Sequence, residues 1–380
     1  MPSDPISPDI PSAPPLAPAG RDTARSTGFY APELDALRCI AVLFVMFAHF
    51  SPTLARHADW GALGVRLFFV LSGFLITEVL LNARQRVDEG RMTVVRAVRQ
   101  FFVRRIFRLW PLFFGSLLAA YAFKVPGTNT NILWHLCFAT NCYVFLYHDW
   151  PILLSHYWTL AVEQQFYLVW PLAVLLLPRR VFPAVLVAVL AAGPVTRALL
   201  LLRASSSPDY DFVLLPCCFD FFALGGLVAW WRHWGRLGSI ASSGTLKAAM
   251  IAALGWMVFG AILRTDAAVP PGWAVYDALI QAIGFAALIA YLLSPPQGSP
   301  TRWLRLPPLV YLGQISYGIY IFHNFMHRLG PAILRRVIGM NYFQSEILHA
   351  TYLITLSVAV ASVSYHAFEA PIRRLGRRIA

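Results

Sequence analysis

Long apolar stretches separated by short polar connectors occupy almost the whole chain after residue 33. Ten of them approach the roughly 20 apolar residues that an α-helix needs to cross the hydrocarbon core of a bilayer. They cover residues 34–51, 62–81, 106–123, 157–177, 182–202, 213–231, 247–263, 273–293, 308–327 and 346–368. The pattern therefore predicts an all-α polytopic membrane protein with about ten transmembrane helices.

The segment 131–147 is semi-polar and could be counted as an eleventh span, or as a re-entrant one. Counting it as a span would place the pair Arg179 and Arg180 outside. Leaving it out places the arginine-rich connectors, including residues 84–105 and 373–378, on one side, as the positive-inside rule expects of cytoplasmic segments. We therefore expect ten spans with both termini cytoplasmic.

Residues 1–30 differ in composition from the rest of the chain. They contain repeated prolines together with acids and arginines, but no apolar run. Such a segment cannot bury enough apolar surface to offset its ordering entropy, and it lacks the apolar core of a signal peptide. We expect residues 1–30 to be a disordered, Pro-rich cytoplasmic tail and residues 31–380 to be the transmembrane domain, with no room for an appended soluble catalytic domain.

Composition and charge agree with a membrane location. Hydrophobic residues make up 58% of the chain and charged residues 13%, whereas about 25% of residues are charged in soluble proteins. The net charge of +13 lies mainly in the connectors between apolar runs. Because no folded soluble part remains to bind nucleic acid, we expect the bilayer, and not nucleic acid, to be the partner of these cations.

The first apolar run contains two groups that are costly in a membrane. Arg38 lies near its cytoplasmic end, and His49 follows eleven residues later. Eleven residues are about three helical turns and roughly 16 Å of rise, so both side chains project from nearly the same face. Ionisable residues within spanning helices are functional-site hypotheses by default. The alternative is that Arg38 reaches lipid head groups while His49 marks the outer interface.

Glu163 is a second costly group, near the start of the run at residues 157–177. A lone carboxylate in a membrane is expensive unless it is protonated or paired. Because Glu163 and His49 both enter from the outer side, we expect a carboxylate–imidazole pair that orients a general base. The alternative is a structural hydrogen bond between helices.

The segment FFVRRIFRLWP places Arg105 and Arg108 at the cytoplasmic boundary of the third span. Arginine forks suit phosphate groups, so the pair is a candidate phosphate clamp. Flanking residues of the positive-inside kind are the alternative.

Other polar groups cluster in the ninth run and in residues 124–156. The ninth run carries Ser316, Tyr317, Tyr320 and His323 at mostly three- and four-residue spacing, which indicates a polar seam or simple helix–helix hydrogen bonding. His135, His148, Asp149 and His156 lack the tight spacing of metal ligands, so we expect no metal site.

Six segments, in order, resemble the acyltransferase family 3 membrane proteins, which O-acylate carbohydrates and some other acceptors. They run through most of residues 33–371 and read LDALR with ten residues before His49, GVRLFFVLSGFLIT, RRIFRLWP, YWTLAVEQQFYLVWPL, SYGIYIFH and FEAPIRR. By this resemblance, Arg38 and His49 correspond to the family's arginine and its ten-residue-spaced histidine. Arg105 and Arg108 match the RxxR pair, and Glu163 matches the membrane-embedded glutamate.

Two positions depart from the family's usual pattern. Ala36 stands where the family usually has glycine, and Thr159 where it usually has serine. Neither change removes a titratable group, so activity is expected to survive. The hydrolase-like domain that is fused to some members is not expected here.

The resemblance implies a membrane O-acyltransferase of the bacterial cytoplasmic (inner) membrane. Its donor would be acyl-CoA, usually acetyl-CoA, on the cytoplasmic side, and its acceptor a hydroxyl of a carbohydrate or glycolipid on the outer side. Arg38, Arg105 and Arg108 would fix the CoA phosphates. His49 would act as general base or carry the acyl group briefly, with Glu163 orienting it.

The alternative function is a multi-span transporter or flippase of a lipid-linked sugar, which ten spans would also suit. Against it, the sequence shows no paired helices broken by glycine or proline in matching halves. Acceptor identity, acyl chain length and oligomeric state are left open by the sequence.

Overall fold

The computed structural model of the protein describes residues 29–125, 128–203, 207–266, 272–295, 299–340 and 343–380. These ranges contain helices, turns and loops, and no β-strand among them. Residues Ala31–Ala380 form one compact unit. Except for Phe29 and Tyr30, the tail predicted at residues 1–30 lies outside the described residues, so its disorder stays a prediction.

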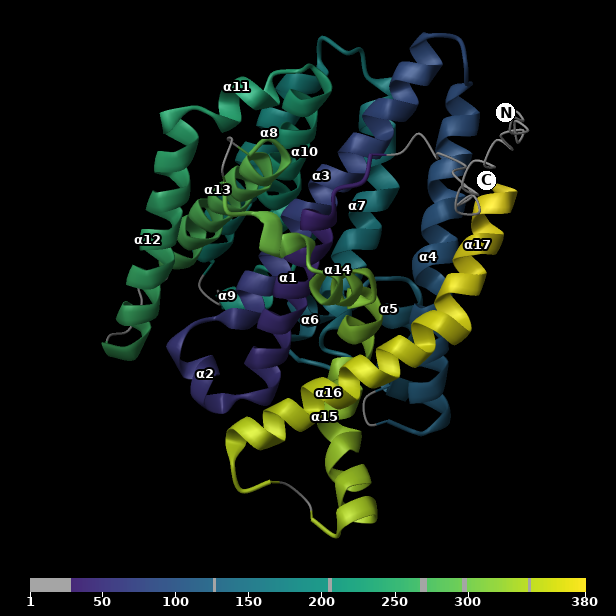
Figure 1. Cartoon of the computed structure of the whole chain (residues 1–380), viewed down its shortest axis with the longest axis vertical. Coiled ribbons are helices and arrows are strands. Elements are labelled where there is room, and N and C mark those ends of the chain that lie inside the picture. The colour runs from purple at the N-terminus through teal and green to yellow at the C-terminus, as the bar shows by residue number, and fades with distance from the viewer. Residues whose placement is uncertain (1–28, 126–127, 204–206, 267–271, 296–298, 341–342) are drawn as a thin grey trace, which may run out of the picture. The chain divides into compact units, whose positions relative to one another are not determined.

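The helices carry the labels of Figure 1. They are α1 (Pro32–Phe50), α2 (Pro52–His57), α3 (Trp60–Asp88), α4 (Val94–Ala122), α5 (Thr128–Leu136), α6 (Thr140–Tyr147), α7 (Tyr157–Leu176), α8 (Phe182–Leu201), α9 (Pro208–Asp211), η1 (Leu215–Cys218), α10 (Phe219–His233), α11 (Leu237–Ala241), α12 (Gly244–Asp266), α13 (Trp273–Leu293), η2 (Arg302–Arg305), α14 (Pro307–Gln314), α15 (Ser316–Ile338), α16 (Glu346–Ser364), η3 (Tyr365–Glu369) and α17 (Ala370–Ile379).

Among the described residues, five helical stretches are long and apolar enough to cross a membrane. They are α3, α7, α8, α13 and the continuous stretch Glu346–Ile379. The all-helical membrane class is thus confirmed, whereas the count of ten spans and the cytoplasmic termini stay predictions. The first two turns of α1 carry Glu33, Asp35 and Arg38, and these three charges keep this apolar helix out of the five.

The helices α1, α3 and α10 pack side by side and form the centre of the helical unit (Figure 1). A β-carbon added at Gly64 of α3 would collide with the carbonyl oxygen of Ala41 in α1, and one at Gly73 would collide with that of Phe222 in α10. Small residues allow such close helix approach in membrane proteins. These contacts fix α3 between the two neighbours, and both α1 and α3 line the candidate site.

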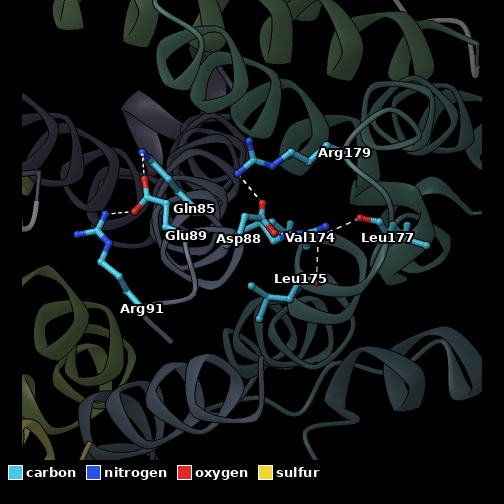
Figure 2. Close-up of polar contacts among 9 residues, drawn as sticks. Gln85, Asp88, Glu89, Arg91, Val174, Leu175, Leu177 and Arg179 are labelled. Atoms are coloured by element: carbon cyan, nitrogen blue, oxygen red, sulfur yellow. Dashed lines mark hydrogen bonds and ion pairs between the residues drawn. The ribbon is translucent and has the colours of Figure 1, made fainter. Parts of the chain in front are cut away.

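The C-terminal end of α7 is fastened to α3 by a single arginine. The Nη1 atom of Arg84 donates to the carbonyl oxygens of Val174, Leu175 and Leu177 at 2.9–3.0 Å. These carbonyls belong to the helix end, where no backbone donor is left for them. Figure 2 shows the carbonyl of Leu177 at this end and Arg179 reaching Asp88, which also accepts from the Nε atom of Arg84 at 3.0 Å. The network holds α7, which carries Glu163, in register with α3.

The semi-polar segment 131–147 is not one continuous helix. Residues 128–136 form α5 and residues 140–147 form α6, with a break between them at which Phe138 has a positive φ of 51°. Helices of nine and eight residues are too short to cross the roughly 30 Å hydrocarbon core. Leaving this segment out of the predicted spans agrees with the structure.

Two predicted spans differ from the helices that form. The run 308–327 is interrupted at Ile315, where α14 ends and α15 begins, and α15 continues to Ile338. The run 346–368 ends in the π-helical turn η3, beyond which α17 continues and packs on α4. Hydropathy alone carries no signal for the break at Ile315, because this residue is apolar and fully buried.

Candidate active site

Two adjoining cavities lie between the helices. The larger has a volume of about 840 Å³ and includes His49 in its lining. The smaller has a volume of about 80 Å³ and is lined from α1, α3, α4, α7 and α15. Val65, Phe69 and Tyr320 line both cavities. These three side chains, called the common wall below, are where groups held in the two cavities could meet.

The smaller cavity collects four of the five site residues predicted from sequence. Arg38, Arg105, Arg108 and Glu163 all line it, although they come from three different helices. His49, the fifth predicted residue, lines the larger cavity. The structure therefore separates the predicted site into a cationic part and a histidine part.

Guanidinium groups dominate the charge of the smaller cavity. Arg38 forms an ion pair with Asp35, three residues earlier in α1, at 3.2 Å. Arg105 lies over the ring of Tyr167, 5.7 Å from the ring centroid. Neither Arg105 nor Arg108 has a carboxylate within ion-pair distance among the residues that the structure describes. Two guanidinium groups without such a pair suit an anionic ligand, since arginine forks bind phosphate in two-pronged fashion.

Glu163 is held on the side of the arginines. One of its carboxylate oxygens accepts from the hydroxyl of Ser72 in α3 at 2.6 Å. The hydroxyl of Tyr167, one turn further along α7, donates to the same serine at 3.5 Å. Glu163 thus joins α7 to α3 beside the cationic cluster.

His49 stands in the last turn of α1 with an exposed side chain that lines the larger cavity. Its Nδ1 atom lies 2.8 Å from the carbonyl oxygen of Val45. A carbonyl can only accept, so Nδ1 carries the proton and Nε2 keeps a lone pair in the neutral ring. A lone pair on a fixed imidazole is what a general base needs.

The direct pair predicted between His49 and Glu163 is not formed. The imidazole is oriented by the backbone of its own helix, and the carboxylate by Ser72. The prediction was wrong because entry from the same side of the membrane does not fix the direction in which a helix face points. Glu163 faces the smaller cavity, whereas His49 faces the larger one.

The polar seam predicted on the ninth run is present and runs along α15. Ser316, Tyr317 and Tyr320 line the smaller cavity, and the hydroxyl of Tyr317 donates to the carbonyl of Leu109 at 2.8 Å. The hydroxyl of Tyr320 lies 2.6 Å from that of Thr159. Threonine at position 159 therefore supplies the hydroxyl that serine would supply.

The larger cavity has a charged wall that sequence reasoning missed. Arg66 of α3 donates to Asp277 and to Gln281 of α13, both at 2.7 Å. Gln281 in turn donates to Asp277 at 2.8 Å. Arg66 lies in the predicted run 62–81 and the other two in the run 273–293, so the rule that flagged Arg38 and Glu163 could have flagged them as well.

A second ion pair lies deeper at the same cavity. Arg197 of α8 is 1% exposed and Asp220 of α10 is fully buried. The two nitrogens of Arg197 reach the two oxygens of Asp220 at 2.9 and 2.6 Å, which is the two-pronged geometry that arginine favours with carboxylates. Arg197 also lines the cavity, so the pair fixes the position of a cation there.

Aromatic rings complete the lining of the larger cavity. Trp150, Trp158 and Trp273 are among its lining residues. Flat apolar rings beside a few fixed polar groups are typical of pockets for organic ligands. No group of three or more His, Cys, Asp or Glu side chains that could hold a metal ion occurs in the described part of the chain.

Long apolar helices around an arginine cluster and a fixed imidazole suit a membrane enzyme that binds an anionic co-substrate. The chain belongs to the acyltransferase 3 family. The family model, an acyltransferase domain, matches residues 32–366.

The chain is also similar to curated bacterial proteins. It is 26% identical over 379 residues to the peptidoglycan O-acetyltransferase OatA of Listeria monocytogenes, a match covering 93% of this chain and 57% of that protein. It is 25% identical over 375 residues to the O-acetyltransferase OatA of Staphylococcus aureus, covering 91% of this chain and 58% of the relative. The chain thus spans less than two thirds of these relatives. No solved structure matches it.

Proposed function

We propose that the protein transfers an acyl group, most simply acetyl, from acyl-CoA to a hydroxyl of a carbohydrate or glycoconjugate. The observation that carries the proposal is the pair of adjoining cavities, of which one is lined by the arginine cluster and the other by His49. The smaller cavity offers arginines, and the larger one offers a histidine with a free lone pair. The common wall lies where a thioester and a hydroxyl would have to meet.

The donor is assigned to the smaller cavity. Arg105 and Arg108, which have no carboxylate partner in the described part of the chain, together with Arg38, would hold phosphates of CoA while its thioester arm reaches the common wall. At about 80 Å³, the cavity suits a short acyl group and the end of the arm better than a whole nucleotide. In the proposed topology, with ten spans and both termini cytoplasmic, these arginines face the cytoplasmic side of a bacterial inner membrane.

The acceptor is assigned to the larger cavity. Its volume of about 840 Å³ falls within the range of small-molecule sites, about 300–1,000 Å³. Tryptophan rings can cover the apolar face of a sugar, while Arg66 and Asp277 can address its hydroxyls. The peptidoglycan O-acetyltransferase named among the relatives supports a carbohydrate acceptor on the outer side.

The chemistry follows from the position of His49. Its Nε2 atom removes the proton from the acceptor hydroxyl, and the oxygen attacks the thioester carbonyl carbon. The carbon–sulfur bond then breaks, and the thiolate leaving group takes the proton from His49, giving an ester and free CoA. In a two-step variant, His49 carries the acyl group before the hydroxyl attacks. In this scheme Glu163 stays hydrogen-bonded to Ser72 beside the arginines and does not contact His49.

Purified protein in lipid nanodiscs tests the proposal directly. Acetyl-CoA and a candidate glycan are supplied, free CoA is measured with a thiol reagent, and the acetylated product by mass spectrometry. We expect His49→Ala to abolish both signals and Arg105→Ala to raise the donor KM.

His57→Ala and Arg374→Ala, on exposed residues outside both cavities, serve as matched controls. Full activity of His49→Ala would overturn the mechanism, and sugar movement in proteoliposomes without acyl transfer would favour the transporter alternative.

A further inference from the structure

A second histidine lies against His49, on the side away from the cavity lining. His323 of α15 is fully buried and does not line either cavity. The centroid of its ring is 4.9 Å from that of His49, with the planes at 76°. It is also 5.1 Å from the ring of His156, at 70°. Three imidazole rings therefore stand together at one edge of the larger cavity.

The protonation state of His323 is fixed by its own helix. Its Nδ1 atom lies 2.6 Å from the carbonyl oxygen of Tyr320. The carbonyl can only accept, so Nδ1 carries the proton and Nε2 holds the lone pair. With Nδ1 turned to the backbone of α15, Nε2 is directed away from that helix. It is buried and has no hydrogen-bond partner in the described structure, an uncommon condition that calls for an explanation.

His156 has the opposite tautomer. The side-chain nitrogen of Asn324 donates to the carbonyl of Leu153 at 2.9 Å, which fixes its amide orientation, and lies 3.3 Å from Nδ1 of His156. Nδ1 of His156 therefore accepts, and its Nε2 carries the proton. Burial lowers the pKa of His156 to about 3, so the ring stays neutral at ordinary pH. His156 offers a donor at Nε2, which is likewise buried and without a hydrogen-bond partner in the described structure, and His323 offers an acceptor.

We propose that His323 is a positioning residue for the acyl transfer, whose Nε2 lone pair stabilises the positive charge that His49 acquires when it accepts the hydroxyl proton. His323 is the ring in contact with His49, and it presents an acceptor nitrogen without a hydrogen-bond partner in the described structure. The interaction is an electrostatic one between this lone pair and the charged ring, because both N–H groups of protonated His49 are engaged, one by the Val45 carbonyl and the other by the reacting oxygen or sulfur. No bond is made to His323, and the proton still passes from the hydroxyl to His49 and then to the thiolate.

Other titratable groups surround this pair. His327 and Tyr320 lie on the same helix as His323, with the ring of His327 stacked on Phe50, and His349 of α16 lies near His327. The charged residues that line the larger cavity with His49 are Asp59, Arg66, Arg197, Asp209 and Asp277. All of them are retained in the variants below, so a change in pH dependence reports on position 323.

Three substitutions test the roles of the two ring nitrogens of His323 separately. His323→Gln keeps an acceptor where Nε2 stands, His323→Asn keeps only a donor for the Tyr320 carbonyl, and His323→Phe keeps only the ring. An electrostatic contact to a charged group inside a protein is worth enough to change a rate by about 10- to 100-fold. We expect kcat to fall by that factor in the Asn and Phe variants, with the donor KM unchanged, and by less than about fivefold in the Gln variant.

The pH profile is the readout that a merely structural role would not move. The lone pair favours protonated His49, so its loss lets His49 give up its proton at lower pH. The acidic limb of kcat/KM, which rises as the free base forms, should therefore move to lower pH in the Asn and Phe variants and stay in place in the Gln variant.

Folding and dependence on the proposed function are controlled separately. Gel filtration and thermal melting check each variant, and if His323→Phe fails to fold, the comparison of Asn with Gln decides. This inference rests on the proposed function. Activity of His49→Ala would overturn that function, whereas an inactive His49→Ala with an unmoved acidic limb in the Asn and Phe variants would overturn only the role of His323.

Discussion

The hydroxyl groups of Tyr320 and Thr159 lie 2.6 Å apart, and Tyr320 belongs to the common wall. The carbonyl oxygen of His156 lies 2.9 Å from the Thr159 hydroxyl and 3.2 Å from the Tyr320 hydroxyl, so one hydroxyl donates to the carbonyl while the other donates to its fellow hydroxyl. α7 and α15 are therefore joined through one shared carbonyl, beside the point where donor and acceptor would meet.

Thr159→Ser should keep this arrangement, whereas Thr159→Val should break it. Valine has the shape of threonine but no hydroxyl, so Tyr320 loses its shorter hydrogen bond. We expect the valine variant to lose about 0.5–1.5 kcal/mol of stability and the serine variant to match the natural protein. Thermal melting in detergent measures the difference, and equal melting temperatures for all three proteins would refute the role of this hydroxyl.

Glu163→Gln tests the separation of Glu163 from His49. Glutamine can still accept from Ser72, but it removes the negative charge beside the arginines. We expect the donor KM to change by up to about tenfold, since a charge beside a bound anion is worth on the order of 1 kcal/mol. The acidic limb of the pH–rate profile should stay in place. A shift of the acidic limb to lower pH, as expected for His323→Phe, would instead indicate that Glu163 and His49 form a direct carboxylate–imidazole pair.

Removing one partner of the pair Arg66–Asp277 should cost more than removing both. Their side chains are 16% and 4% exposed, and a buried charge that loses its ion-pair partner is penalised by about 3–5 kcal/mol. Arg66→Met and Asp277→Leu should each lower the melting temperature, and the double variant should recover part of the loss. A double variant less stable than either single one would contradict a compensated pair. Among folded variants, Arg66→Met should raise the acceptor KM and leave the donor KM unchanged.

Arg84→Ala should loosen the end of α7 without touching either cavity. The three carbonyls that Arg84 serves would lose their donor, at a cost of roughly 1–3 kcal/mol. Arg91→Ala is the control, because Arg91 pairs with Glu89 on the exposed surface (Figure 2), where ion pairs contribute about 0–1 kcal/mol. A melting temperature for Arg84→Ala equal to that of Arg91→Ala would show that the carbonyls find other donors.

Glu346→Ala should disturb the segment that follows His49. The carboxylate accepts from the hydroxyl and amide of Thr53 at 2.6 and 2.9 Å, and from the hydroxyl of Ser51 at 2.5 Å. Losing these bonds frees the start of α2 and with it the last turn of α1. We expect kcat to fall by about tenfold, with the donor KM unchanged. Kinetics at varied acetyl-CoA check this, and Glu346→Gln, which retains an acceptor, should lie between.

Sequence reasoning reached the class of fold and the composition of the smaller cavity. Apolar runs of bilayer length predicted membrane helices, and charges inside them identified Arg38 and Glu163. The spacing of Arg105 and Arg108 placed both on one face of α4, and both line the cavity.

Two features of the three-dimensional arrangement could not be predicted from the sequence. The same-face argument for Arg38 and His49 holds along α1, yet each residue lines a different cavity, because α3 and α15 place the common wall between them. Hydropathy likewise gives no indication of the helix break at Ile315. It depends on the packing of α14 against α1, where Gly313 lies close to the backbone of Asp35.

The common wall has an electrical consequence for a membrane that must hold a potential. In the proposed reaction an acyl group moves outward past Tyr320, and the hydroxyl proton moves inward to the thiolate. An acylium equivalent exchanged for a proton transfers no net charge, so a potential worth about 2.3 kcal/mol per charge at 100 mV neither drives nor opposes the step. The side chains that separate the two cavities would let the reaction proceed without opening a path for ions across the bilayer.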